Sequence, residues 1–113
     1  MITIYHNPRC GKSRECLAFL QNSNFEFEIV KYLDINFTFN TLSEILNKLN
    51  INPIDLVRIK EPIWIQNYKS KQLSNEEIIK AMVLHPTLIE RPIVVNKNKA
   101  IIARPLDKIN LIL

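Results

Sequence analysis

The sequence predicts an α/β fold in which helices flank a four-stranded mixed sheet, with a helical insertion between its βαβ and ββα halves. Residues 2–5 and 25–32 have strand patterns on either side of a helical pattern at 13–22. Residues 38–84 carry only helical signals, and residues 92–103 are typical of a hairpin. A strand–helix–strand unit of this length gives a right-handed parallel crossover, whereas hairpin strands are antiparallel, so the sheet is mixed.

The first half of the fold is a parallel strand pair. Ile2–Tyr5 alternates apolar and polar residues, and Phe25–Tyr32 sets Phe and Ile against Glu, as strands with one buried face do. The helical pattern between them begins at Ser13 and ends in the turn Asn22–Asn24.

The middle of the chain is predicted to be helical. Thr38 is a good N-cap for a helix that ends near Leu49, and Pro53 favours the first position of a short helix. Residues 61–72 indicate a helical turn that packs Trp64 and Tyr68 inward, with no chemical role assigned to either. Ser74–Glu77 is a capping box that starts the last helix of this segment.

The end of the chain is predicted to form a hairpin and a closing helix. Pro92–Val95 and Lys99–Ala103 are the strands, joined by a polar turn. Leu106, Ile109 and Ile112 have the spacing of one helix face.

Composition sets limits on the class of protein. The chain has 113 residues, 47% of them hydrophobic and 23% charged, which is typical of one globular domain covering residues 1–113. There is no apolar run of membrane-spanning length and no signal-like start, so we expect a cytoplasmic protein without a membrane partner. A net charge of +4 is too mild to indicate nucleic-acid binding. We expect no bound metal.

The most informative stretch is Tyr5–Arg14, which is predicted to run from strand through a tight loop to a helix start. Cys10 falls where the helix begins, so free backbone N–H groups and the helix dipole favour its thiolate form. The basic residues of the stretch are expected to add to this effect, and they are His6, Arg9, Lys12 and Arg14. Gly11 is the only glycine in the chain, which predicts backbone crowding or an unusual dihedral angle beside Cys10.

A buried, unreactive Cys10 is the alternative, because cysteine often behaves as a small hydrophobe. The polar neighbours of Cys10 favour a reactive thiol instead. Cys16 would lie about 9 Å farther along the same helix, beyond disulfide reach, and is expected to be a core residue. Ser13 occupies the second position of a Cys-x-x-Cys pair, so the site has a single thiol and an oxidised product needs an external thiol to reset it.

Three arginines occur in apolar or proline-rich contexts, unlike the ten scattered lysines. They are Arg58, Arg91 and Arg104. A planar, permanently charged donor of this kind suits bidentate capture of an oxyanion. The alternative is that each makes a structural ion pair or extends its charge to solvent.

A reactive cysteine directly after the first strand of such a sheet is the arrangement of thioredoxin-like proteins. In that arrangement a cis-proline before the third strand lies across from the cysteine loop. Pro92 is the residue at that place, and we predict a cis bond there.

The sequence resembles the glutaredoxin-linked arsenate reductases, the ArsC-like proteins in their short form. The stretch His6–Arg14 matches their His-x3-Cys-x3-Arg signature, and Ile89–Val95 resembles a later block of the family. Tyr32-Leu33 and Ala103–Pro105 extend the resemblance to nearly the whole chain.

The resemblance implies an enzyme in which Cys10 attacks arsenate or a similar oxyanion. It places oxyanion binding on Arg58, Arg91 and Arg104. It also implies that His6 helps to keep the thiolate, and that the motif arginine is Arg14. Glutathione is then a co-substrate rather than a bound cofactor, and glutaredoxin reduces the arsenic adduct so that arsenite leaves.

Three other interpretations remain open at this point. One is a related glutathione-dependent thiol reductase with a different substrate. Another is a regulator resembling Spx, which binds RNA polymerase, although Ser13 in place of a second cysteine and the full arginine set favour an enzyme. A purely structural domain would leave the polar loop around Cys10 unexplained.

Overall fold

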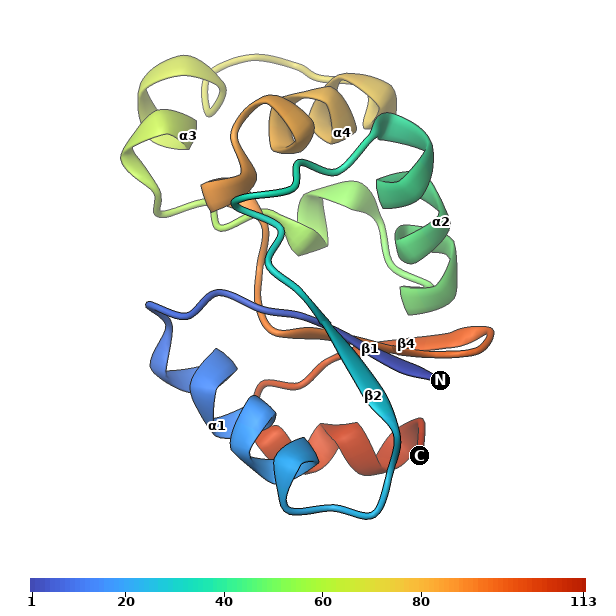
Figure 1. The fold of residues 1–113 in the computed structure, drawn as a ribbon. Coiled ribbons are helices and arrows are strands. Elements are labelled where there is room, and N and C mark those ends of the chain that lie inside the picture. The colour runs from blue at the N-terminus through green and yellow to red at the C-terminus, as the bar shows by residue number, and fades with distance from the viewer. The chain divides into compact units, whose positions relative to one another are not determined.

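The computed structural model describes all 113 residues, which form two compact units (Figure 1). The first unit contains Met1–Ile35 and Arg91–Leu113, and the second, Asn36–Glu90, is inserted between these segments. That the two units fold as one domain stays a prediction. None of the helices combines the length and apolar character needed to cross a membrane.

The first unit is built on a four-stranded mixed sheet, as predicted. Its strands are β1 (Ile2–Tyr5), β2 (Phe27–Val30), β3 (Ile93–Asn96) and β4 (Lys99–Ile102), in the order β2-β1-β3-β4. β1 pairs with β2 in parallel and with β3 in antiparallel, so that Ile4 lies opposite Ile29 on one side and Val94 on the other. β3 and β4 form the predicted antiparallel hairpin.

Two helices lie on the same face of this sheet, α1 (Gly11–Gln21) and η3 (Leu106–Leu111) (Figure 1). Between them and the strands is a core of Ile2, Ile4, Cys16, Leu20, Val94, Ala103, Ile109 and Ile112. The closing helix is a 3₁₀ helix rather than the α-helix expected from its spacing.

β2 is shorter than the predicted strand at 25–32, because turns occupy both of its ends. Before the strand, Ser23 Oγ accepts the N–H of Phe25 at 3.2 Å. After the strand, the carbonyl of Lys31 accepts the N–H groups of Asp34 and Ile35. β2 is an edge strand, and 42% of its residue Ile29 is exposed. Phe25, which precedes the strand, is 47% exposed.

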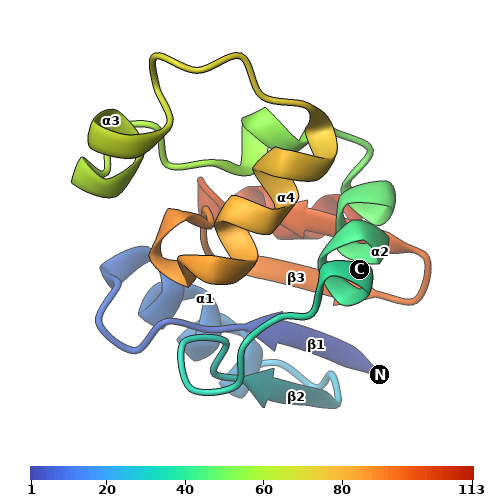
Figure 2. The same ribbon diagram turned by 90° about the horizontal axis from the view of Figure 1, so that it is seen from above.

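The second unit is helical throughout. It contains α2 (Phe39–Leu49), η1 (Pro53–Leu56), α3 (Pro62–Asn67), α4 (Asn75–Leu84) and η2 (Pro86–Leu88). α2 packs against α4 (Figure 2). The predicted caps are present, since Thr38 Oγ1 accepts the N–H of Thr41 and Ser74 forms a reciprocal capping box with Glu77.

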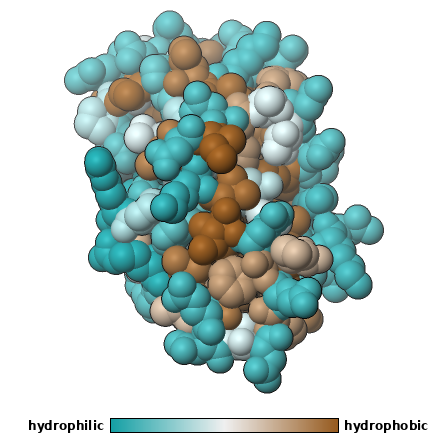
Figure 3. Space-filling model, in the orientation of Figure 1, coloured by the Kyte–Doolittle hydropathy of each residue, from teal (hydrophilic) through white to brown (hydrophobic).

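Trp64 packs inward from α3, as the sequence predicts. Its ring stacks on that of Tyr68, with centroids 5.4 Å apart, and only 6% of the residue is exposed. On the face seen in Figure 3, hydrophilic residues predominate and hydrophobic residues are exposed in patches between them.

Candidate active site

Cys10 is the N-cap residue of α1, at the end of a loop that follows β1. The side chain of Asn7 shapes this loop, because its Oδ1 atom accepts the N–H of Arg9 at 3.0 Å. The carbonyl of Asn7 accepts the N–H of Cys10 itself at 3.0 Å. The sulfur is therefore held at the positive end of a helix, as the sequence predicts, with 9% of the residue exposed.

The environment of Cys10 lowers the pKa of its thiol. Burial acts in the opposite direction and would raise this pKa. It is outweighed by a hydrogen bond from the Arg91 side chain, by the backbone N–H groups of Ser13 and Lys12, and by the charge of Arg91. These donors all favour the thiolate, the nucleophilic form of cysteine.

Ser13 and His6 form a buried hydrogen-bonded pair beside Cys10. Ser13 Oγ lies 2.6 Å from His6 Nδ1 and also accepts the N–H of Asn7 at 3.0 Å. Sequence reasoning treats Ser13 only as a missing second cysteine and does not predict this role. The available signal is a polar side chain in the first turn of α1, on the face that also carries Cys16 and Leu20.

His6 does not supply the extra cation expected from the sequence. It is buried, and its pKa lies below the ordinary value of 6.5 because of burial and, to a smaller degree, the nearby charges of Lys31 and Arg14. The lowered pKa disfavours the charged form of the imidazole. Its contact with Ser13 instead makes it a positioning residue of the loop.

The other basic residues of the loop have different places. Arg14 extends back along the loop and donates from its NH1 atom to the carbonyl of Pro8 at 3.1 Å. Lys12 points to solvent, 3.9 Å from Glu15. The cation that hydrogen-bonds the sulfur is Arg91, from the far end of the sequence, and not one of the neighbours expected to do so.

The sequence predicts backbone crowding or an unusual dihedral angle at Gly11, and this prediction is wrong. It is the first residue of α1 and has no positive φ angle. A Cβ atom added there would meet only the Arg14 side chain, at an ordinary contact distance of 3.8 Å.

Arg91 and Arg104 are joined within the first unit. The NH1 atom of Arg104 donates to the backbone carbonyl of Arg91 at 3.1 Å. The bond between Arg91 and Pro92 is cis, in agreement with the prediction for Pro92, and the Arg104–Pro105 bond is also cis, which was not predicted. Two of the three singled-out arginines therefore lie in one hydrogen-bonded group with Cys10.

Arg58 belongs to the second unit, where it is paired with two carboxylates. Its Nε atom lies 3.3 Å from Glu61 Oε1, and its NH1 atom lies 2.8 Å from Glu90 Oε1. Its backbone N–H donates to the carbonyl of Leu88 at 2.7 Å. The structural ion pair considered for this residue is thus present.

Cys16 is the core residue that the sequence predicts. It is fully buried, makes no disulfide, and burial raises the pKa of its thiol to about 11. The chain contains no group of three or more His, Cys, Asp or Glu side chains arranged to hold a metal ion.

The structure is thioredoxin-like, with a cysteine of lowered pKa at the N-terminus of its first helix. The chain belongs to the ArsC family, whose model matches residues 5–112.

Individual relatives span almost the same length as this chain. The arsenate reductase of Neisseria meningitidis is 38% identical over 99% of this chain and 97% of that protein. The uncharacterized protein YfgD of Escherichia coli is 44% identical over 96% of this chain and 92% of that protein. Among solved structures, an arsenate reductase from Vibrio cholerae is 38% identical and matches with a TM-score of 0.93, over 99% of this chain and 97% of that one.

Proposed function

We propose that this protein is an arsenate reductase that uses the thiolate of Cys10 as its nucleophile. The observation that carries the proposal is the hydrogen bond from the Arg91 side chain to the Cys10 sulfur at the start of α1. Relatives named arsenate reductases support the choice of substrate.

The chemistry of arsenate suits a thiolate that lies beside arginine side chains. Arsenate is a tetrahedral oxyanion, so attack on its arsenic atom by an anionic sulfur needs fixed positive charge to offset the repulsion. In the proposal Arg91 first holds the thiolate and then also binds an arsenate oxygen. Arg104, bonded to the carbonyl of Arg91, is the second oxyanion ligand.

Arg58 is proposed as the third oxyanion ligand, on the resemblance alone. Its pairing with Glu61 and Glu90 offsets its charge, because two carboxylates share one guanidinium. An incoming oxyanion would compete with these carboxylates for Arg58, whereas Arg91 already faces the sulfur.

The proposed cycle uses three thiols in turn. Cys10 displaces an oxygen of arsenate and forms an As–S bond, and the oxygen leaves as water. Glutathione displaces a second oxygen of the arsenic, which also leaves as water, and forms a second As–S bond. A glutaredoxin thiol attacks the glutathione sulfur, so a mixed disulfide of glutathione and glutaredoxin forms and the electron pair of that As–S bond stays on the arsenic, which is reduced by two electrons. Water then hydrolyses the bond between Cys10 and the arsenic, which releases arsenite and the Cys10 thiolate.

The proposal includes no bound cofactor and places the protein in the cytoplasm. Both cysteines are free, and thiols stay reduced in a compartment supplied with glutathione.

A coupled assay tests the function directly. Arsenate-dependent oxidation of NADPH is measured with glutathione, glutathione reductase and glutaredoxin, for the unaltered protein, Cys10→Ser and Cys16→Ala. We expect activity in the first and third proteins and none in Cys10→Ser. Equal activity in Cys10→Ser, or no arsenate-dependent oxidation by any of the three, would contradict the proposal.

A further inference from the structure

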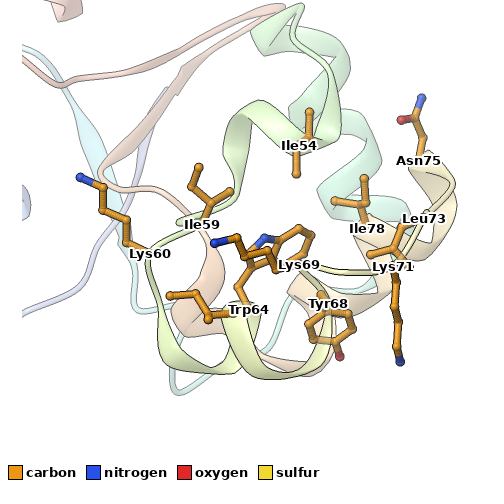
Figure 4. Close-up of a pocket in the computed structure, with 11 residues that line it drawn as sticks. Ile54, Ile59, Lys60, Trp64, Tyr68, Lys69, Lys71, Leu73, Asn75 and Ile78 are labelled. Carbon is orange, nitrogen blue, oxygen red and sulfur yellow. The ribbon is translucent and has the colours of Figure 1, made fainter.

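The second unit contains a hollow whose lining residues have no part in the proposed reaction. It has a volume of about 670 Å³ and lies among η1, α3 and the start of α4 (Figure 4). Its apolar lining includes Ile54, Ile59, Trp64, Tyr68, Leu73 and Ile78. We call it the lysine-rimmed hollow, for the charges described below.

The apolar side chains form both the base and the edge of this hollow. Trp64 and Ile78 are buried, whereas 54% of Ile59 and 48% of Ile65 are exposed. Exposed isoleucines grouped around a concavity are unusual for a surface that faces only water, and such patches mark interaction sites.

The charged residues that line the hollow are all lysines, namely Lys60, Lys69 and Lys71. Lys60 and Lys71 lie at opposite ends and extend outward, which leaves the apolar side chains between them (Figure 4). No carboxylate lines the hollow, so its positive charge is not offset from within.

A second, smaller hollow of about 280 Å³ continues the same surface along α4. It shares Tyr68, Lys71 and Leu73 with the first and adds Lys80 and Leu84, the latter 70% exposed. Its one acidic residue, Glu77, is engaged in the capping box with Ser74. Lys80 is paired with Glu76 at 3.7 Å, so this second hollow extends the apolar surface, whereas the lysines of the first hollow supply the unpaired positive charge of its lining.

We propose that the lysine-rimmed hollow docks an acidic segment of another protein, in which large apolar side chains lie between Asp and Glu residues. The apolar side chains would fill the hollow and the carboxylates would meet the lysines, so the partner is defined by charge complementarity and shape. The residues that line this hollow are not among those proposed for the reaction, and the test of the docking proposal does not depend on arsenate reduction.

Two other occupants fit the geometry less well. A membrane is entered by protruding apolar side chains, whereas Trp64 and Ile78 are buried at the base of a concavity. Single-stranded nucleic acid stacks its bases on exposed aromatic rings, whereas the Trp64 ring already stacks on Tyr68.

The chain provides its own reporter, because Trp64 is its only tryptophan and lines the hollow. The full-length protein is titrated with a synthetic peptide of sequence Asp-Glu-Phe-Glu-Asp-Leu-Leu-Glu-Asp while tryptophan fluorescence is recorded. One control peptide has Lys at every acidic position, and a second has Ala in place of Phe and Leu. We expect a saturable change with the acidic apolar peptide and none with either control.

Variants connect the signal to the surface. The double variant Lys69→Glu, Lys71→Glu should weaken binding at least tenfold, since it reverses two rim charges, and Ile59→Ser should weaken it through the apolar edge. The double variant Lys99→Glu, Lys108→Glu, an equal charge change on β4 and η3, should bind like the unaltered protein. Far-ultraviolet circular dichroism checks that each variant is folded.

Several results would overturn the proposal. These are no saturable change with the acidic peptide, an equal response to the lysine peptide, or unchanged binding by the Lys69→Glu, Lys71→Glu variant. Displacement of the peptide by an oligonucleotide or by anionic vesicles at comparable charge would show a general anion surface instead. Self-association that the Lys69→Glu, Lys71→Glu variant abolishes, measured by sedimentation, would make a second copy of this chain the occupant.

Discussion

His6 Nδ1 lies 2.6 Å from Ser13 Oγ, and this buried contact joins the end of β1 to the first turn of α1. The same hydroxyl oxygen accepts the N–H of Asn7, so one side chain holds both flanks of the loop that carries Cys10. Removing it would leave two buried polar groups without their partner, which costs more than losing an exposed hydrogen bond.

Ser13→Ala should therefore lower the free energy of unfolding by about 1–3 kcal/mol, measured by urea denaturation. The exposed Ser70→Ala is the matched control and should change it by less than about 0.5 kcal/mol. A Ser13→Ala protein as stable as the control would mean that the loop does not depend on this hydroxyl.

His6 should make stability depend on pH. The pKa of His6 in the folded protein lies below 6.5, mainly because of burial, so at lower pH the unfolded chain takes up a proton that the folded chain resists. This contribution to the free energy of unfolding is complete above pH 6.5 and is lost as the pH falls below it. Urea denaturation across this range should show the decline, and His6→Gln should reduce it. An unchanged decline in His6→Gln would assign it to other groups.

Gly11→Ala should be tolerated and slightly stabilising. Gly11 has no positive φ angle, and a Cβ atom there would make only an ordinary contact with the Arg14 side chain, so the main effect of alanine is to lower the entropy of the unfolded chain. We expect a gain of about 0.4–1 kcal/mol in the free energy of unfolding. A loss of similar size would show that the loop does need glycine here.

Arg91→Lys should lose most of its affinity for the oxyanion while the fold survives. An ammonium group cannot reproduce the planar fork of a guanidinium, but the carbonyl of residue 91 would still accept from Arg104. Arsenate binding by calorimetry tests this, with thermal unfolding as the check on folding. Equal affinity in the lysine variant would exclude bidentate capture by Arg91.

Much of the first unit could be predicted because its signals are local. The strand pattern of Ile2–Tyr5, the position of Cys10 at the start of α1 and the burial of Cys16 each follow from neighbouring residues. The cis bond at Pro92 is predicted from the place of this proline before the third strand of a thioredoxin-like fold, not from the neighbouring residues.

The features of the site that the sequence does not predict depend on contacts between residues that are far apart in the sequence, or on burial. Lys12 is beside Cys10 in the sequence but points to solvent, whereas Arg91 is 81 positions away and reaches the sulfur. His6 is expected to add a positive charge because it is close to Cys10 in the sequence, yet its burial lowers the pKa of the imidazole and disfavours the charged form. The sequence shows Ser13 only as a residue that is not a second cysteine. In the structure its hydroxyl contacts His6 and accepts the N–H of Asn7, and so holds the two sides of the loop together.

The most direct test is a thiolate absorbance titration of Cys10, made in a Cys16→Ala background so that only one thiol is present. The Cys10 pKa should lie clearly below the value of about 8.5 for a free cysteine, and Arg91→Ala should raise it, because the main side-chain donor to the sulfur is then gone. A pKa at or above the free value, or one that does not change in Arg91→Ala, would contradict an activated Cys10 held by Arg91.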